Sequence, residues 1–309
     1  MTTLALHLTE ALITAARAHW VLADAPVTLI AARENRVYRV DSPTGPAALR
    51  IHREEYRTVS ELRSELQWMA MLADNGIPVP APIPAADGTH LLVHGGIALD
   101  MLTWLEGSPL TAAVPSEHIY FELGALVARM QSYADVWAPP PNFTRPTWDL
   151  QGGDPTWGRF WENPELTTEQ VKLFIRFRDH AANAITRLPS PDVGLIHADL
   201  VPDNVLLHGG QLQPIDFDDG GFGYRLFDLA TVTFRSRRTD PTGALARAVI
   251  AGYASERSMG LDALPLFEAL RACSYVGWNI ARMAEGEGQE RNTRFIRAAI
   301  VAVKIVLSD

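Results

Sequence analysis

Short runs of alternating apolar and polar residues fill the first hundred positions and predict strands. These runs are 27–32, 37–40, 47–52, 91–94 and 97–105. Two stretches with apolar residues at helical spacing interrupt them, over 9–22 with Thr9 as a candidate N-cap, and over about 58–73. Residues 41–46 are rich in turn formers and predict a hairpin loop between the second and third strands. The pattern indicates a mostly antiparallel sheet with one inserted helix.

Beyond Glu106, Gly107, Ser108 and Pro109 the spacing becomes helical. Helices are predicted over 116–134, 167–188, 226–236, 242–256, 264–284 and 289–307. This change of period predicts an α+β protein with two domains, at 1–105 and 106–309. The segment 136–165 contains six prolines and four tryptophans. It is predicted to fold over the C-terminal half or to form a packed surface loop, rather than one long helix.

Composition narrows the classes of partner. A net charge of −9 argues against a broad surface for the phosphate backbone of nucleic acids. No run of about 20 apolar residues predicts a membrane helix, and the N-terminus lacks the pattern of a secretory leader. The lone Cys273 suits a reducing compartment, so a cytoplasmic location is expected. No pattern indicates the oligomeric state.

The strongest chemical signal is the H-x-D-L-x-x-x-N spacing within 196–206, which is that of a kinase catalytic loop. A phosphoryl acceptor needs a carboxylate that orients its hydroxyl and takes its proton, and Asp199 supplies one. Five residues later, Asn204 offers an amide oxygen of the kind that magnesium accepts. His197 is interpreted as a brace of this loop.

A second acidic motif follows a predicted hairpin. Residues 205–208 and 211–215 alternate as strands, and Gly209 with Gly210 suits a two-residue turn between them. The hairpin leads into Asp216, which is predicted to share a magnesium ion with Asn204, since magnesium is commonly held by two protein oxygens and substrate phosphates. The alternative is a solvated acidic turn.

The motifs H-A-D-L-V-P-D-N-V-L, I-D-F-D-D and G-x-x-x-x-D-L-A resemble the aminoglycoside phosphotransferase and choline kinase superfamily. Type II homoserine kinases and bacterial stress-response kinases also belong to it. The resemblance implies a protein-kinase-like fold with an N-terminal nucleotide-binding lobe and a C-terminal catalytic lobe, and it implies ATP and Mg²⁺. Asp199 would be the catalytic base, Asn204 and Asp216 the metal ligands, and Asp228 a structural brace of the catalytic loop.

In the N-terminal half, residues 47–50 stand where protein kinases have V-A-I-K. By the resemblance Arg50, in place of the usual lysine, would contact the nucleotide phosphates and Ala48 would leave room for adenine. The only lysines, at 172 and 304, lie outside this half. Glu65 would pair with Arg50, although Glu61, one turn earlier, competes for this role.

The resemblance also implies an adenine pocket. It assigns Val37 beneath adenine, Thr103 and Leu105 to a hinge where an edge strand becomes a loop, and Leu206 and Ile215 to an apolar floor. The glycines of a phosphate-covering loop are missing near residues 34–36, so backbone N–H groups and the Arg36 side chain are the candidates there.

Three functions remain open from the sequence. The first is a kinase that acts on a hydroxyl of a small molecule, such as an aminoglycoside, amino alcohol, homoserine-like compound or sugar. The second is a bacterial stress-type serine/threonine protein kinase. The missing A-P-E segment after Asp216 disfavours a conventionally regulated protein kinase but not these stress-type relatives. The third is a nucleotide-binding regulator without turnover, which the intact Asp199, Asn204 and Asp216 argue against.

Overall fold

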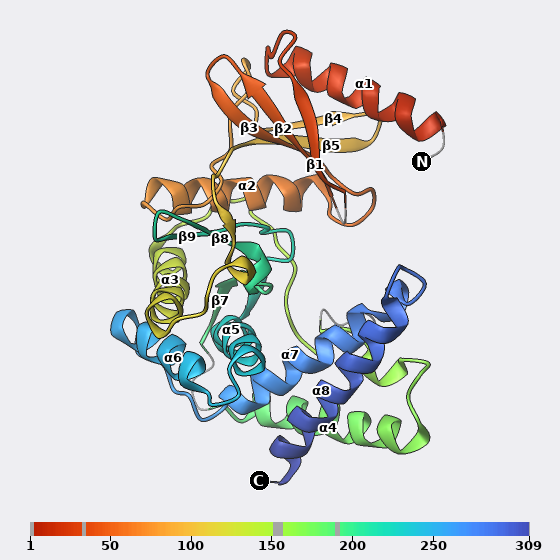
Figure 1. Cartoon of the computed structure of the whole chain (residues 1–309), viewed down its shortest axis with the longest axis vertical. Helices are drawn as coiled ribbons and strands as arrows, with labels where there is room; N and C mark the ends of the chain where they lie inside the picture. The colour runs from red at the N-terminus through yellow and green to blue at the C-terminus, as the bar shows by residue number, and fades with distance from the viewer. Residues whose placement is uncertain (1–2, 33–34, 151–156, 189–191, 309) are drawn as a thin grey trace. The chain divides into compact units, whose positions relative to one another are not determined.

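The computed structural model describes residues 3–32, 35–150, 157–188 and 192–308 (Figure 1). The chain divides into two compact units. The first comprises Met1–Ser108, Trp137–Arg145 and Leu206–Asp218. The second comprises Pro109–Val136, Pro146–Val205 and Asp219–Asp309. An antiparallel sheet in the first and a mainly helical second unit confirm the predicted α+β class. The predicted domain boundary near residue 105 stays a prediction.

A five-stranded sheet forms the centre of the first unit, in the order β1-β2-β3-β5-β4 with antiparallel neighbours. The elements are α1 (Thr3–His19), β1 (Val27–Ala32), β2 (Arg36–Ser42), β3 (Gly45–Ile51), α2 (Val59–Asp74), β4 (Leu91–His94) and β5 (Ile97–Thr103). The five predicted strands and the inserted helix are confirmed. Neighbouring residues determine where α2 begins, because Thr58 and Glu61 form a capping box at its N-terminus.

The side chains of β3 alternate between the two faces of the sheet. Ala47, Leu49 and Ile51 point into an apolar cluster that includes Leu12 of α1 and Trp20, which directly follows this helix. Fully burying a side chain such as Leu49 contributes about 1.5–3 kcal/mol, so this face fastens α1 to the sheet. Arg50 lies on the opposite face and pairs there with α2.

Three local predictions in this unit are wrong. Thr9 is inside α1 rather than at its cap, and its hydroxyl accepts a bond from Arg36 at 2.9 Å. The hairpin loop is shorter than 41–46, because β2 and β3 stay paired as far as Ser42 and Gly45. Pro46 stands opposite Asp41, whose own N–H group donates to the Pro26 carbonyl on the other side of β2. β5 is not an edge strand, since it lies between β3 and β4.

The remaining elements are mostly helical, as the change of period predicted. They are β6 (Ser108–Pro109), α3 (Glu117–Val136), α4 (Thr168–Thr186), β7 (Val193–Ile196), β8 (Val205–His208), β9 (Gln211–Pro214), β10 (Gly221–Tyr224), α5 (Arg225–Thr239), α6 (Ala244–Glu256), α7 (Leu264–Trp278) and α8 (Gly288–Ser308). Short 3-10 turns span Leu110–Ala112, Phe160–Glu162, Pro202–Asn204 and Ile280–Arg282.

The antiparallel pair of β7 and β10 was not anticipated. Glycine is depleted in strands, so the sequence around β10 carries little strand signal. Tertiary packing requires the glycines: a Cβ at Gly221 would lie 2.2 Å from the Pro146 carbonyl oxygen, and one at Gly223 would lie 2.5 Å from the Ile196 side chain. Close packing therefore overrides propensity here.

The tryptophan-rich segment is divided between the units. Trp148 and Trp157 are buried in the second unit, with ring centroids 5.1 and 5.6 Å from that of Phe227. Trp137–Arg145 belongs to the first unit instead, so the predicted cover of the C-terminal half is wrong for this part. Residues 151–156 lie outside the described residues.

Across the described part of the chain, no helix combines the length and apolar character that crossing a membrane requires.

Close packing of α3 and α6 generates a stability prediction. A Cβ at Gly252 would lie 1.8 Å from the Phe121 carbonyl oxygen, so Gly252→Ala must push the two backbones apart. We expect a loss of roughly 2 kcal/mol or more in unfolding free energy, measured by urea denaturation. Gly260→Ala is the matched control, because no atom lies within 4 Å of that position. Equal stability of the two variants would contradict the packing.

Candidate active site

The Arg50 guanidinium lies buried between two carboxylates of the first unit. Its Nη1 donates to Glu65 Oε1 at 2.8 Å, while Nε and Nη2 donate to the two oxygens of Asp100 at 2.8 and 2.7 Å. The predicted contact between Arg50 and Glu65 is therefore present. Glu61 instead accepts the backbone and side-chain hydrogens of Thr58, which removes it as the competing partner.

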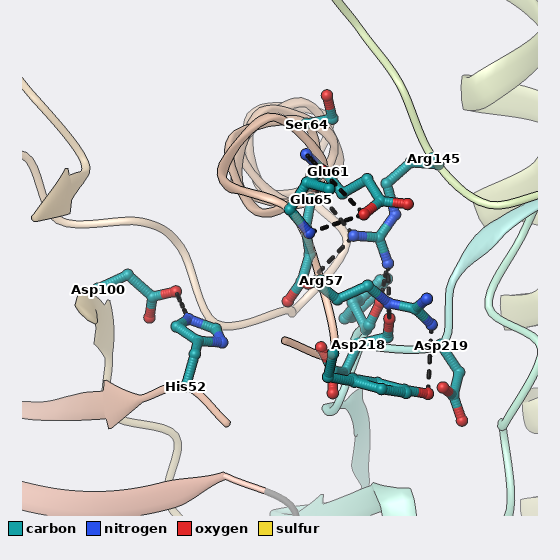
Figure 2. A network of polar contacts seen from close by, with 12 residues as sticks. His52, Arg57, Glu61, Ser64, Glu65, Asp100, Arg145, Asp218 and Asp219 are labelled. Carbon is teal, nitrogen blue, oxygen red and sulfur yellow. Dashed lines mark hydrogen bonds and ion pairs between the residues drawn. The ribbon is translucent and has the colours of Figure 1, made fainter. Parts of the chain in front are cut away.

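Asp100 and His52 complete this cluster and were missed by the sequence reasoning. His52 Nε2 lies 2.7 Å from Asp100 Oδ2, and a dashed line in Figure 2 marks the contact between these two residues. Burial would raise the pKa of Asp100, but Arg50 and His52 hold that pKa well below its usual range. The signal was the register: Asp100 stands directly opposite Arg50 across β3 and β5. Register becomes readable only once these two strands are known to be neighbours.

The cluster limits what Arg50 can offer a nucleotide. Its three nitrogens each bond a carboxylate, although Nη1 and Nη2 carry a second hydrogen each. Two buried carboxylates also offset the positive charge of the guanidinium. The contact of Arg50 with phosphate remains a prediction, and the second hydrogens of Nη1 and Nη2 are the donors that it would use.

The residues assigned to adenine are distributed over the sheet and hairpin of the first unit. Val37 and Ala48 are half-buried on β2 and β3, and Leu105, Leu206 and Ile215 are half-buried as well. Thr103 ends β5, and its N–H group already donates to the Ala81 carbonyl at 2.8 Å. The free edge expected there is consequently filled by backbone from residues 81–83. Glu34 of the expected phosphate loop lies outside the described residues.

The hairpin that leads to Asp216 forms as predicted. β8 and β9 flank Gly209 and Gly210, whose φ values of +55° and +86° are the left-handed pair that a tight turn requires. Asp216 follows with an exposed side chain and a φ of +66°, an uncommon conformation for a residue other than glycine. Such backbone persists only where the surroundings enforce it.

In the second unit, Asp199 and Asn204 lie together. The Asn204 amide nitrogen donates to Asp199 Oδ2 at 2.9 Å and to the Asp199 carbonyl at 3.0 Å. The nitrogen is used in this way, and the amide oxygen is the atom that the predicted binding of a cation would use. Asp216 belongs to the other unit, so joint binding of a metal by Asn204 and Asp216 stays a prediction.

The loop before Asp199 is braced by Asp228 of α5, the role that the resemblance implied. The Asp228 carboxylate accepts the N–H groups of His197 and Ala198 at 2.9 and 2.7 Å. Ala198 has a φ of +65°, which is strained for alanine. Two charge-assisted bonds at this point stabilise the strained turn. His197 takes part as well, since its Nδ1 accepts the Asp199 N–H group at 3.3 Å.

Arg271 of α7 is a further neighbour of Asp199 that sequence reasoning missed. Its Nη1 donates to the Ala198 carbonyl at 3.1 Å, and its Nη2 bonds Asp199 Oδ1 and the Tyr275 hydroxyl. Burial raises the pKa of Asp199, while the positive charge of Arg271 opposes that rise. An arginine within an apolar helix was the only sequence signal, and nothing in α7 tied it to residue 199.

Among the described residues, no three or more His, Cys, Asp or Glu side chains gather as a metal site. Magnesium is commonly held by one or two protein oxygens, with phosphates and waters completing its shell. The exposed carboxylate of Asp216 and the amide oxygen of Asn204 are donors of that kind.

Known proteins resemble this chain over most of its length. The profile of the phosphotransferase enzyme family matches residues 26–267. A homoserine kinase of Neisseria meningitidis is 28% identical over 239 residues, or 73% of this chain and 72% of that protein. An amicoumacin kinase of Bacillus subtilis is 25% identical over 233 residues, or 73% and 67%. The solved structure of a microcompartment-associated aminopropanol kinase has a TM-score of 0.81 at 26% identity and covers 95% of each chain.

The buried ion cluster predicts how stability depends on pH. The pKa of Asp100 is lower in the folded than in the unfolded chain, so protonation favours unfolding and stability is lost as pH falls below about 4. Asp100→Asn should lower the unfolding free energy at pH 7 by about 3 kcal/mol and lessen its decline in acid. Chemical denaturation between pH 7 and 3 measures both. Parallel curves for the variant and the wild type would disprove the assignment.

Proposed function

This chain belongs to the phosphotransferase enzyme family, and from that premise we propose that it transfers the γ-phosphate of ATP to a hydroxyl of a small molecule in the presence of Mg²⁺. The observation that carries the proposal is the arrangement of Asp199. Its carboxylate is bonded to Asn204 and Arg271, on a loop that Asp228 braces. A positioned carboxylate on a rigid loop suits phosphoryl transfer, in which catalysis consists mainly of positioning and charge stabilisation.

In the proposed reaction, Asp199 accepts a hydrogen bond from the acceptor hydroxyl and thereby aligns its oxygen. A bond forms between this oxygen and the γ-phosphorus, and the bond from that phosphorus to the β,γ-bridging oxygen breaks. ADP leaves with the electron pair, and the hydroxyl proton passes to Asp199. The raised pKa of this carboxyl favours the transfer.

Asn204 and Asp216 are the proposed protein ligands of the metal. Bound Mg²⁺ supplies positive charge that offsets the charge of the phosphates during transfer. The amide of Asn204 is oriented through its bonds to Asp199. Arg50 is the proposed cationic contact of the phosphates, with Glu65 and Asp100 fixing its direction.

An amino alcohol is the proposed acceptor class. Two of the similar proteins are named for homoserine and for aminopropanol, and both compounds carry an amine and a hydroxyl. A third is named for amicoumacin. A protein hydroxyl is the alternative, and an acceptor panel separates the two.

Turnover should depend on Asp199. With ATP, Mg²⁺ and a panel of amino alcohols, sugars, aminoglycosides and a generic protein substrate, ADP release identifies the acceptor. Asp199→Asn should then lower turnover by about 10²- to 10⁴-fold, with ATP binding nearly unchanged, because a positioned base is lost. Asp179→Asn, at an exposed site on α4, is the control. Wild-type turnover by Asp199→Asn on the identified acceptor would rule out the base assignment.

Metal dependence should depend on Asp216. Asp216→Asn should remove most of the tightening of ATP binding by Mg²⁺, because a metal ligand loses its charge. Calorimetric titration of ATP with and without Mg²⁺ measures this effect. Asp74→Asn removes an exposed carboxylate at the end of α2 and should bind as the wild type does. Full metal dependence in Asp216→Asn would exclude Asp216 as a ligand.

A further inference from the structure

Arg145 is a buried arginine of the first unit to which neither the motifs nor the proposed reaction assigns a role. It ends the segment Trp137–Arg145, which returns to this unit from a distant part of the sequence. Figure 2 shows its guanidinium between Asp218 and the α2 helix, which bears Glu61, Ser64 and Glu65. Burying a guanidinium is costly unless its donors are satisfied, so its acceptors are informative.

Acceptors from two separate segments contact the two terminal nitrogens of Arg145. Nη1 donates to the Glu61 carbonyl at 3.0 Å and contacts Glu65 Oε2 at 3.4 Å. Nη2 donates to the carbonyls of Phe217 and Asp218 at 2.9 and 2.8 Å. One planar group thus connects α2 with the two residues that follow Asp216.

These contacts link Arg145 to the two groups of the first unit with a proposed chemical role, which are the Arg50–Glu65 pair and Asp216. Glu65 bonds Arg50 through one carboxylate oxygen and contacts Arg145 through the other. The bonded carbonyls of Phe217 and Asp218 fix the 217–218 and 218–219 peptide planes, one and two residues beyond Asp216, whose φ of +66° needs support from its surroundings. The orientation of the Asp216 carboxylate and that of Arg50 therefore depend on the same guanidinium.

The surrounding residues favour one position of Arg145. The Thr144 N–H group donates to Ser64 Oγ at 2.9 Å, which fastens the preceding residue to α2. Phe217 is fully buried, and its ring meets that of Trp68 edge to face at 5.1 Å. Burial lowers the pKa of Arg145, and the negative charge of Glu65 counteracts that effect. An arginine remains charged under these conditions.

We propose that Arg145 is a positioning residue that sets the metal ligand Asp216 and the Arg50–Glu65 pair in one arrangement. The proposal rests on the proposed function, since it takes Asp216 as a ligand of Mg²⁺. The planar fork is essential, because a lysine ammonium has three donors without the geometry to reach acceptors on both segments. A residue that orients a metal ligand typically changes metal affinity roughly 10- to 100-fold when it is removed.

The test measures ATP binding by calorimetry as a function of Mg²⁺ concentration. Arg145→Gln should raise the Mg²⁺ concentration for half-maximal tightening roughly 10- to 100-fold, and ATP binding in EDTA should weaken by less than this, because the Arg50–Glu65 pair loses one of its supports. Arg145→Lys should shift it in the same direction. In the Asp216→Asn background, Arg145→Gln should cause no further shift, because both changes act through one ligand.

Arg225→Lys is the matched control for loss of a buried guanidinium. Arg225 is buried in the second unit, where it bonds Asp192 and the Leu195 carbonyl. This variant should lose stability in thermal unfolding while keeping the wild-type Mg²⁺ midpoint. The comparison separates a general loss of stability from an effect on the metal.

Two outcomes overturn the proposal alone. One is a folded Arg145→Gln or Arg145→Lys with a wild-type Mg²⁺ midpoint, and the other is failure of both variants to fold, which would make Arg145 a stabilising residue only. If wild-type protein shows no Mg²⁺-dependent ATP binding, the proposed function is wrong, and the inference about Arg145 is then wrong as well. The wild-type titration thus distinguishes the two failures.

Discussion

The first unit depends on the burial of the Arg50 guanidinium between Glu65 and Asp100. A charge removed from water is tolerated only when partners and hydrogen bonds replace its hydration, and removing one partner leaves the other uncompensated. The ion cluster therefore fixes β3, β5 and α2 relative to one another. Replacing such a cluster with apolar residues would often cost little stability. Its presence is accordingly better explained by a need for charge at this position than by a need for stability.

The second unit solves a different problem, which is to hold a short loop in a strained conformation. Ala198 adopts a left-handed φ that alanine disfavours, and the buried carboxylate of Asp228 compensates by accepting two backbone hydrogens. Asp199 follows directly and is held through Asn204 and Arg271. Strain of this kind is concentrated at functional sites, where it orients a reactive group before substrate binds.

Opposing effects act on the two principal carboxylates. In Asp100, nearby positive charge dominates, and the pKa is held low enough that the group stays ionised in its cluster. In Asp199, burial dominates over the charge of Arg271, and the pKa is raised. A carboxylate that stays charged suits the proposed partner of a phosphate-binding arginine, and a carboxylate able to take a proton suits the proposed base.

The sequence by itself determined the features that arise from neighbouring residues. Capping boxes at Thr58 and Thr167, the turn at Gly209 and Gly210, and the spacing of Asp199 and Asn204 all involve groups within five positions of each other. Local geometry settles such contacts. Alternation along β3 likewise placed Arg50 on the face away from the apolar cluster.

Only the tertiary structure decided which residues, distant in the sequence, contact the side chains that these local features position. Asp100 is 50 residues from its partner Arg50, Arg271 is 72 from Asp199, and Arg145 is 80 from Glu65. Strands such as β10 also formed against their glycine content, because close packing left no room for a side chain. Periodicity assigns a residue to a face but not to a partner, since the partner depends on strand order, register and helix packing across the whole unit.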